Sequence, residues 1–236
     1  ATVSLEDRSV ELAQVAVQGP RSREVLISLG ATALEGLKLH HTCDGTIGGL
    51  SCLLARTGYT GELGYEIYID SNKVGRLWDL LIDRGKVWGV NPAGLGARDL
   101  LRLEMGYLLY GNDMDEDTTP FEANADWTVS VQKGEFIGRQ ALLAQKQSGV
   151  PRRFVAFELV EKAVPRHGFR ILDPTAFHSI GEVTSGNLSP LLQKGIGLGY
   201  VPLRYAEPGT SILIEIRGKS LPAFIVKPPF YKRKKA

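Results

Sequence analysis

The sequence predicts an α+β fold, in which an antiparallel-sheet α/β sandwich precedes a second, all-β domain. Residues 10–85 follow the order strand, helix, strand, strand, helix, which is typical of a sheet with helices on one face. Gln147–Pro151 is polar and contains glycine and proline, so we expect a linker there. Beyond it, short apolar runs alternate with glycine turns. We therefore expect one domain in residues 1–150 and another in residues 151–236.

The sheet is expected to begin with a strand at Val10–Val17. Pro20 favours the first turn of a helix, and Gly30 favours its end. Two further strands, Leu37–Cys43 and Leu50–Ala55, are predicted to form a hairpin around the glycines of residues 44–49.

Tyr65–Ile69 is expected to continue or follow this hairpin, and a helix comes next. Ser71 can cap that helix, whose apolar residues recur every three or four positions until Gly85. Asn91-Pro92 then predicts the start of another helix, which ends at Gly106. Farther on, we expect a short strand at Trp127–Val131 and a helix at Phe136–Leu143.

The second domain is predicted from six short apolar runs, which favour a β-barrel or a β-sandwich. They are Phe154–Val160, Phe169–Leu172, Ile180–Thr184, Ile196–Val201, Ile212–Ile216 and Phe224–Val226.

Composition excludes several classes of function. A net charge of +2 gives no general affinity for nucleic acid, and the longest apolar run is too short for a membrane span. Cys43 and Cys52 are too few for a disulfide scaffold or a structural zinc set, so we expect both to be small apolar side chains on neighbouring strands. They fit a reducing compartment, the cytoplasm, or the mitochondrial matrix in a eukaryote. The four histidines lack metal-ligand spacing, so we assign no metal. The acids Asp113, Asp115 and Asp117 are expected to be solvated.

The segment Arg56–Asp70 is the strongest candidate for a binding site. Gly58, Gly61 and Gly64 permit a tight turn or a close backbone approach. The period-two end of the segment places Glu66 on the face opposite Ile67. A carboxylate in a mainly buried strand needs a donor. Glu66 is therefore either a paired surface residue or an acceptor for a ligand with adjacent N–H donors.

Two arginines lie four residues apart on the helix that follows. Arg98 and Arg102 therefore share a helix face. Both could pair with carboxylates of the protein, and for Arg102 this is the preferred interpretation.

Seven motifs in this order resemble the aminomethyltransferase of the glycine cleavage system, the T-protein family, over essentially the whole chain. They are Val17–Pro20, Arg56–Glu66, Gly96–Glu104, Tyr110–Asp113, Lys133–Arg139, Thr184–Gly186 and Gly199–Pro202. Each motif is weak alone, and the ordered set is specific.

The resemblance implies an enzyme that binds tetrahydrofolate as co-substrate. Members take an aminomethyl group from the lipoyl arm of the H-protein, release ammonia and form methylenetetrahydrofolate. The resemblance also implies a β-barrel for the second domain. Members extend upstream of the residue that matches Ala1, and that part carries the catalytic aspartate. We therefore expect no catalytic residue in this chain, and no activity from it alone.

The resemblance also assigns folate-binding residues. Glu66 would accept the two adjacent pterin N–H groups, with Glu62 as the weaker choice, and Arg98 would donate to pterin acceptors. The remaining candidates are two aromatic residues for ring packing, where core packing is an alternative, and two residues of the C-terminal tail. They are Tyr107, Trp127, Tyr231 and Arg233.

Three alternatives remain open. The chain could be the folate-binding region of a dimethylglycine or sarcosine dehydrogenase. It could be a non-enzymatic folate-binding relative, whose signature has cysteine where this chain has Glu135. It could also be a structural domain without a ligand.

Overall fold

The structure is a computed structural model that describes residues 2–232. Two compact units, Ala1–Arg98 and Asp99–Ala236, divide the chain, and each has its own sheet and hydrophobic core. The division falls within helix α3 (Leu95–Glu104), so the segment before the barrel groups with the barrel. The domain boundary expected near residue 150 stays a prediction.

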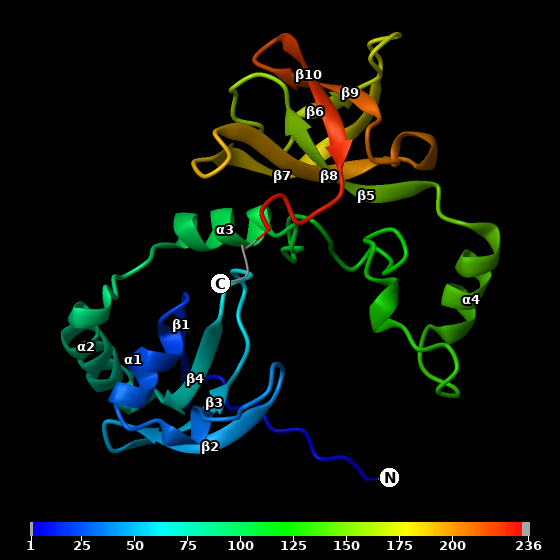
Figure 1. The fold of residues 1–236 in the computed structure, drawn as a ribbon. Coiled ribbons are helices and arrows are strands. Elements are labelled where there is room, and N and C mark those ends of the chain that lie inside the picture. The colour runs from blue at the N-terminus through cyan, green and yellow to red at the C-terminus, as the bar shows by residue number, and fades with distance from the viewer. Residues whose placement is uncertain (1, 233–236) are drawn as a thin grey trace. The chain divides into compact units, whose positions relative to one another are not determined.

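The first unit contains a four-stranded sheet in which every neighbouring pair is antiparallel (Figure 1). The strand order is β1-β4-β3-β2, and the bounds are Leu12–Gln18, Gly64–Asp70, Leu50–Ala55 and Thr42–Ile47. The expected hairpin is present, but its first strand is placed differently. Thr42–Ile47 forms that strand, and Asp44-Gly45 lies inside it.

The turn of this hairpin is Gly48-Gly49, where both residues have positive φ, +56° and +78°. Two consecutive residues with positive φ match the twist of a two-residue hairpin, and glycine adopts them without steric cost. The prediction of Leu37–Cys43 as a strand was therefore wrong by several residues. Cys43 and Cys52 do lie on neighbouring strands, and both are free.

Helices α1 (Ser22–Ser28) and α2 (Val74–Gly85) cover one face of this sheet (Figure 1). The cap before α2 differs from the expected one, because the Asp70 carboxylate accepts the N–H of Asn72 at 2.9 Å and a short 3₁₀ turn, Ser71–Lys73, precedes the helix. The core between the layers is made of residues from both helices and the sheet, including Leu26, Leu54, Tyr65, Ile67, Ile69 and Leu77.

The second unit contains a closed six-stranded barrel, so the barrel interpretation is confirmed (Figure 1). The strands are adjacent in the order β10-β5-β8-β7-β6-β9. In chain order, β5 to β10 are Arg152–Leu159, Arg170–Leu172, Ser179–Ser189, Lys194–Pro202, Ser211–Ile216 and Lys219–Val226. Leu103 of α3 packs on the outer side of β5 and β8, in a cluster with Phe154, Leu198 and Tyr200.

The segment between α3 and the barrel differs most from the sequence prediction. Trp127–Val131 is not a strand, because Asp126–Thr128 forms a 3₁₀ turn. The expected helix is present as α4 (Arg139–Ser148), and it begins later because Gly138 before it has φ +87°.

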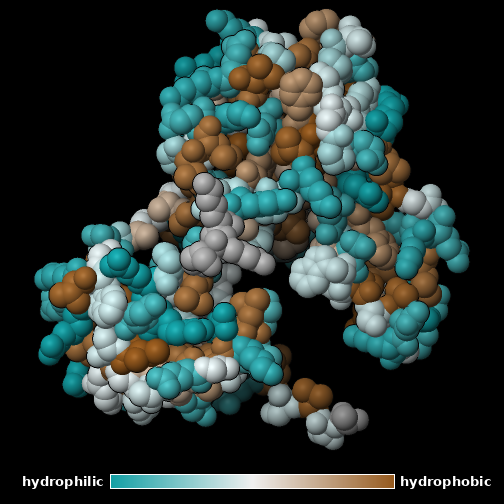
Figure 2. Space-filling model, viewed as in Figure 1, coloured by the Kyte–Doolittle hydropathy of each residue, from teal (hydrophilic) through white to brown (hydrophobic). Residues whose placement is uncertain are grey.

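No helix among residues 2–232 is long and apolar enough to cross a membrane. Hydrophobic and hydrophilic side chains are interspersed on the face seen in Figure 2.

Candidate functional site

Glu66 lies on the sheet face that α1 and α2 leave open. Along β4, Tyr65 and Ile67 are fully buried in the core, while Glu66 between them is half-buried and points to the other side. Its neighbours across the two adjacent strands are Ala16 and Ala55. Because both are alanines, neither of these directly paired side chains reaches over the carboxylate.

Thr57 holds the carboxylate in place. The Thr57 hydroxyl donates to Oε2 of Glu66 at 2.5 Å. Among the described residues, it is the only hydrogen-bond donor recorded for this carboxylate. One oxygen is therefore oriented by the protein, while Oε1 can accept a further N–H.

Gln18 at the end of β1 anchors the loop that carries Thr57. Its Nε2 donates to the carbonyl of Thr57 at 3.2 Å and to that of Tyr65 at 3.3 Å, and its Oε1 accepts the hydroxyl of Thr60 at 3.2 Å. The loop 56–63 is thus joined to two strands through one amide side chain.

The glycines of this motif make room for that amide. A Cβ at Gly58 or Gly64 would lie 2.1 Å or 1.9 Å from Oε1 of Gln18, well inside contact distance. The close approach expected at these glycines is therefore confirmed, and the partner is a side chain of the protein.

Arg98 contacts the same loop. Its guanidinium lies over the ring of Tyr59, 5.0 Å from the centroid, and its side chain is otherwise exposed. A guanidinium that packs on an aromatic face can still donate its forked N–H groups to an acceptor at its edge. Glu66 and Arg98 are therefore linked to one loop, through Thr57 and Tyr59. That both face one ligand stays a prediction.

Arg102, by contrast, is a structural residue, as preferred from the sequence. Its side chain is 1% exposed and donates to Asp99 at 2.7 Å and to Asp113 at 2.5 Å. Asp113 was expected to be solvated, and that expectation was wrong, because its side chain is fully buried. The hydroxyls of Thr184 and Ser185 on β7 also donate to it, at 2.5 Å and 2.7 Å.

The other candidate residues lie in the second unit. Tyr107 follows α3 and is 37% exposed, Trp127 lies in the 3₁₀ turn and is 83% exposed, and Tyr231 is half-buried. Trp127 is therefore not a core residue, which removes the core-packing alternative for it. Arg233 lies outside the described residues. The folate roles of these four stay predictions.

Comparison with known proteins gives the family. The family described as the GCVT N-terminal domain matches residues 1–133, and the glycine cleavage T-protein C-terminal barrel domain matches residues 152–232. The chain belongs to the glycine cleavage T-protein family. The first match alone covers more than half of the chain, and the second coincides with the barrel strands and the segment after them.

Individual members of the family are similar to this chain over most of its length. The aminomethyltransferase of Halothermothrix orenii is 47% identical over 224 residues, which are 95% of this chain and 62% of that protein. The aminomethyltransferase of Bacteroides thetaiotaomicron is 42% identical over 97% of this chain and 63% of its own length. The crystal structure of glycine cleavage system aminomethyltransferase T from Bartonella henselae superposes with a TM-score of 0.85 at 32% identity, over 93% of this chain and 60% of that one. The chain thus spans less than two thirds of these T-proteins.

Sequence reasoning missed the supporting residues of this candidate site. Gln18, Thr57 and Tyr59 were not singled out, although each has a signal in the motifs. Gln18 lies in Val17–Pro20, and the other two lie among the glycines of Arg56–Glu66. The need of a half-buried carboxylate for a donor could have pointed to Thr57.

Proposed function

We propose that this chain is the folate-binding and barrel part of a tetrahydrofolate-dependent aminomethyltransferase. The reaction moves the methylene of an aminomethyl group, carried on the lipoyl arm of the H-protein, to tetrahydrofolate and releases ammonia. We assign no residue of this chain to the role of the catalytic aspartate that the resemblance implies. We place the protein in the cytoplasm, or in the mitochondrial matrix of a eukaryote, to which the free thiols of Cys43 and Cys52 are suited.

The observation that carries this proposal is the oriented carboxylate of Glu66. A reduced pterin presents a 2-amino group beside a ring N–H, and a carboxylate accepts the pair in a charge-assisted arrangement. Thr57 fixes one oxygen of Glu66 and leaves the other available, and the two residues paired directly with Glu66 on the adjacent strands are alanines. These residues fit the donor edge of a pterin.

The chain's residues would act by binding and orientation. Glu66 would set the rotation of the pterin, and Arg98, which contacts loop 56–63 through Tyr59, would donate to pterin acceptors. Holding the folate nitrogens in one position lowers the entropic cost of bringing them to the aminomethyl carbon.

Calorimetry with tetrahydrofolate tests the role of Glu66. We expect Glu66→Ala to weaken binding by roughly 1.5–3 kcal/mol, because a charged acceptor is lost. Glu62→Ala is the matched control, since Glu62 lies in the same motif and is also half-buried. A larger loss with the Glu62 variant than with the Glu66 variant would contradict the assignment.

The transfer itself is tested by folate-dependent ammonia release from aminomethyl-loaded H-protein. In a full-length protein that contains this chain, tetrahydrofolate should accelerate the release, and Glu66→Ala should reduce the acceleration, whereas the 236-residue chain alone should give no measurable transfer. Tight folate binding by that full-length protein without any ammonia release would favour a non-enzymatic folate-binding relative. That alternative has little support here, because Glu135 occupies the position of its signature cysteine.

A further inference from the structure

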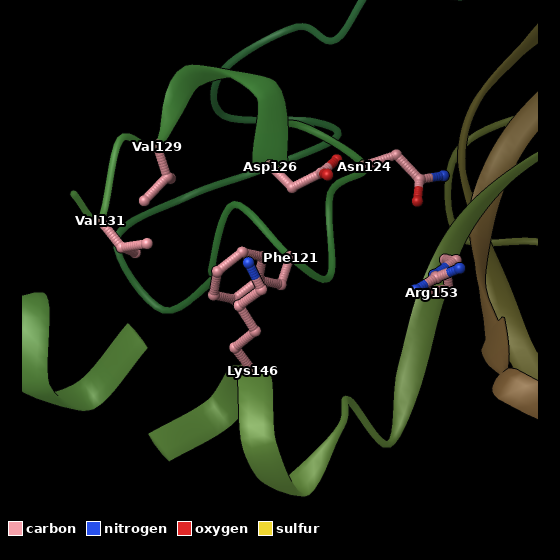
Figure 3. Close-up of a pocket in the computed structure, with 7 residues that line it drawn as sticks. All are labelled: Phe121, Asn124, Asp126, Val129, Val131, Lys146 and Arg153. Atoms are coloured by element: carbon pink, nitrogen blue, oxygen red, sulfur yellow. The ribbon is translucent and has the colours of Figure 1, made fainter. Parts of the chain in front are cut away.

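The second unit contains a pocket that the proposed function does not use. Its volume is about 240 Å³, smaller than the roughly 300–1,000 Å³ typical of sites for drug-sized ligands. The residues that line it come from the turns before α4, from α4 itself and from β5 (Figure 3). They are Phe121, Asn124, Asp126, Val129, Val131, Lys146 and Arg153.

Two cations reach this pocket, and the protein neutralises neither of them. Lys146 enters from α4 and Arg153 from β5 (Figure 3). Neither forms an ion pair with any residue among 2–232. Arg153 also has a buried Nε without a hydrogen-bond acceptor in that range. A buried N–H without a partner is unfavourable, so an acceptor supplied by a ligand would be favoured.

The rest of the lining suits an apolar body attached to that acceptor. Phe121, Val129 and Val131 contribute an aromatic ring and two branched aliphatic side chains. Asp126 is the one carboxylate among the seven described residues of the lining. The two cations therefore outnumber the acid, and the pocket carries a net positive charge beside an apolar wall.

The amide of Asn124 is already engaged, because its Nδ2 donates to the carbonyl of Phe154 at 2.6 Å. This bond ties the turn to β5 beside Arg153. Asn124 also has a positive φ of 55°, a conformation that asparagine tolerates better than most residues. The pocket is thus bordered by a turn that is hydrogen-bonded to β5 and by β5 itself.

We propose that this pocket binds a small organic carboxylate with an apolar body, such as an aryl carboxylate. The carboxylate lies between Lys146 and Arg153 and accepts the N–H groups of the guanidinium. The apolar body rests on Phe121, Val129 and Val131. None of the seven lining residues is among those assigned to folate, so the site can be tested separately from the proposed function.

Titration of the 236-residue chain with sodium benzoate, followed by the NMR signals of the Val129 and Val131 methyl groups, tests the proposal. We expect saturable shifts, with a dissociation constant in the roughly millimolar range for so small a probe. Benzamide, which has the same ring without the charge, should bind about tenfold more weakly. Equal binding of the two probes, or no shift at either valine, would overturn the proposal.

Variants of the charged residues test whether positive charge favours benzoate binding and negative charge opposes it. Lys146→Gln and Arg153→Gln should each weaken benzoate binding about tenfold. Asp126→Asn should strengthen it by about threefold, because a like charge is removed. Lys146 is exposed on α4, so its variant is expected to fold even if the Arg153 variant does not.

The matched control is Lys219→Gln. Lys219 is an exposed cation at the start of β10 and does not line the pocket. Its variant should bind benzoate as the parent chain does. A loss equal to that of Lys146→Gln would show that only the overall charge matters, and weaker binding by Asp126→Asn would contradict the electrostatic argument.

Discussion

Replacement of Arg102 by methionine should strongly destabilise the second unit. Methionine keeps much of the side-chain length and removes every donor of the guanidinium. The carboxylate of Asp113 then stays fully buried and retains only neutral donors, from Thr184, Ser185 and the N–H of Leu109. The variant therefore isolates the loss of the counter-charge from the loss of packing.

The magnitude follows from the burial of the two partners. Arg102 is 1% exposed and the Asp113 side chain 0%, so water cannot replace the missing ion pair. Removing one partner of a buried pair costs about 3–5 kcal/mol. Asp113→Asn should cost less, about 1–3 kcal/mol, because Arg102 keeps Asp99 at 2.7 Å. Asp99→Asn should cost least, since the Asp99 side chain is 43% exposed and water screens its loss.

Hydrogen exchange in increasing urea provides the assay, because it reports on each unit separately. The amides of β8 report the free energy of opening of the barrel, and those of β4 report the first unit. Arg139→Met is the matched control, because the Glu135 partner of Arg139 is 76% exposed and that pair should contribute about 0–1 kcal/mol. A loss below about 1 kcal/mol for Arg102→Met, or a larger loss for Asp99→Asn, would refute the reasoning.

Three further predictions concern the site and the acid stability of the chain. Arg98→Lys should weaken tetrahydrofolate binding measurably, because lysine lacks the planar fork; unchanged affinity would exclude Arg98 from the site. Gly64→Ala should destabilise the first unit by about 1–3 kcal/mol, because the new Cβ displaces the Gln18 amide from its three partners. The double variant Gly64→Ala/Gln18→Ala should lose clearly less than the sum of the two single losses, and strict additivity in urea unfolding would argue against the clash. Burial of Glu122 opposes its ionisation, but the bonds from Thr119 and Arg152 outweigh it and hold its pKa below the ordinary value of 4.5. Its contribution to the free energy of unfolding is therefore present above pH 4.5 and is lost as pH falls through the lower pKa of the folded state. In urea unfolding at a series of pH values, Glu122→Gln should make the free energy of unfolding depend less on pH below 4.5. An unchanged pH dependence would contradict the shift.

The sequence by itself determined the elements whose periodicity is strong. The alternation of Tyr65–Ile69 placed Glu66 opposite Ile67, and the structure shows this arrangement, because successive side chains of a strand point to opposite faces. The six barrel strands were recognisable from apolar runs between glycines. The pairing of Arg102 was also predictable, because an arginine in a helix that packs on a core needs an acceptor.

Only the tertiary structure decided which residues complete these elements. Asp44-Gly45 and Gly48-Gly49 are both turn sequences, and the pairing of β2 with β3 selected the second. The partners of Asp113 come from α3 and from β7, which are far apart in the sequence. Gln18 contacts a loop some forty positions away along the chain. Local propensity depends on neighbouring residues, whereas hydrogen bonds of buried groups depend on which segments the packing of the core brings together.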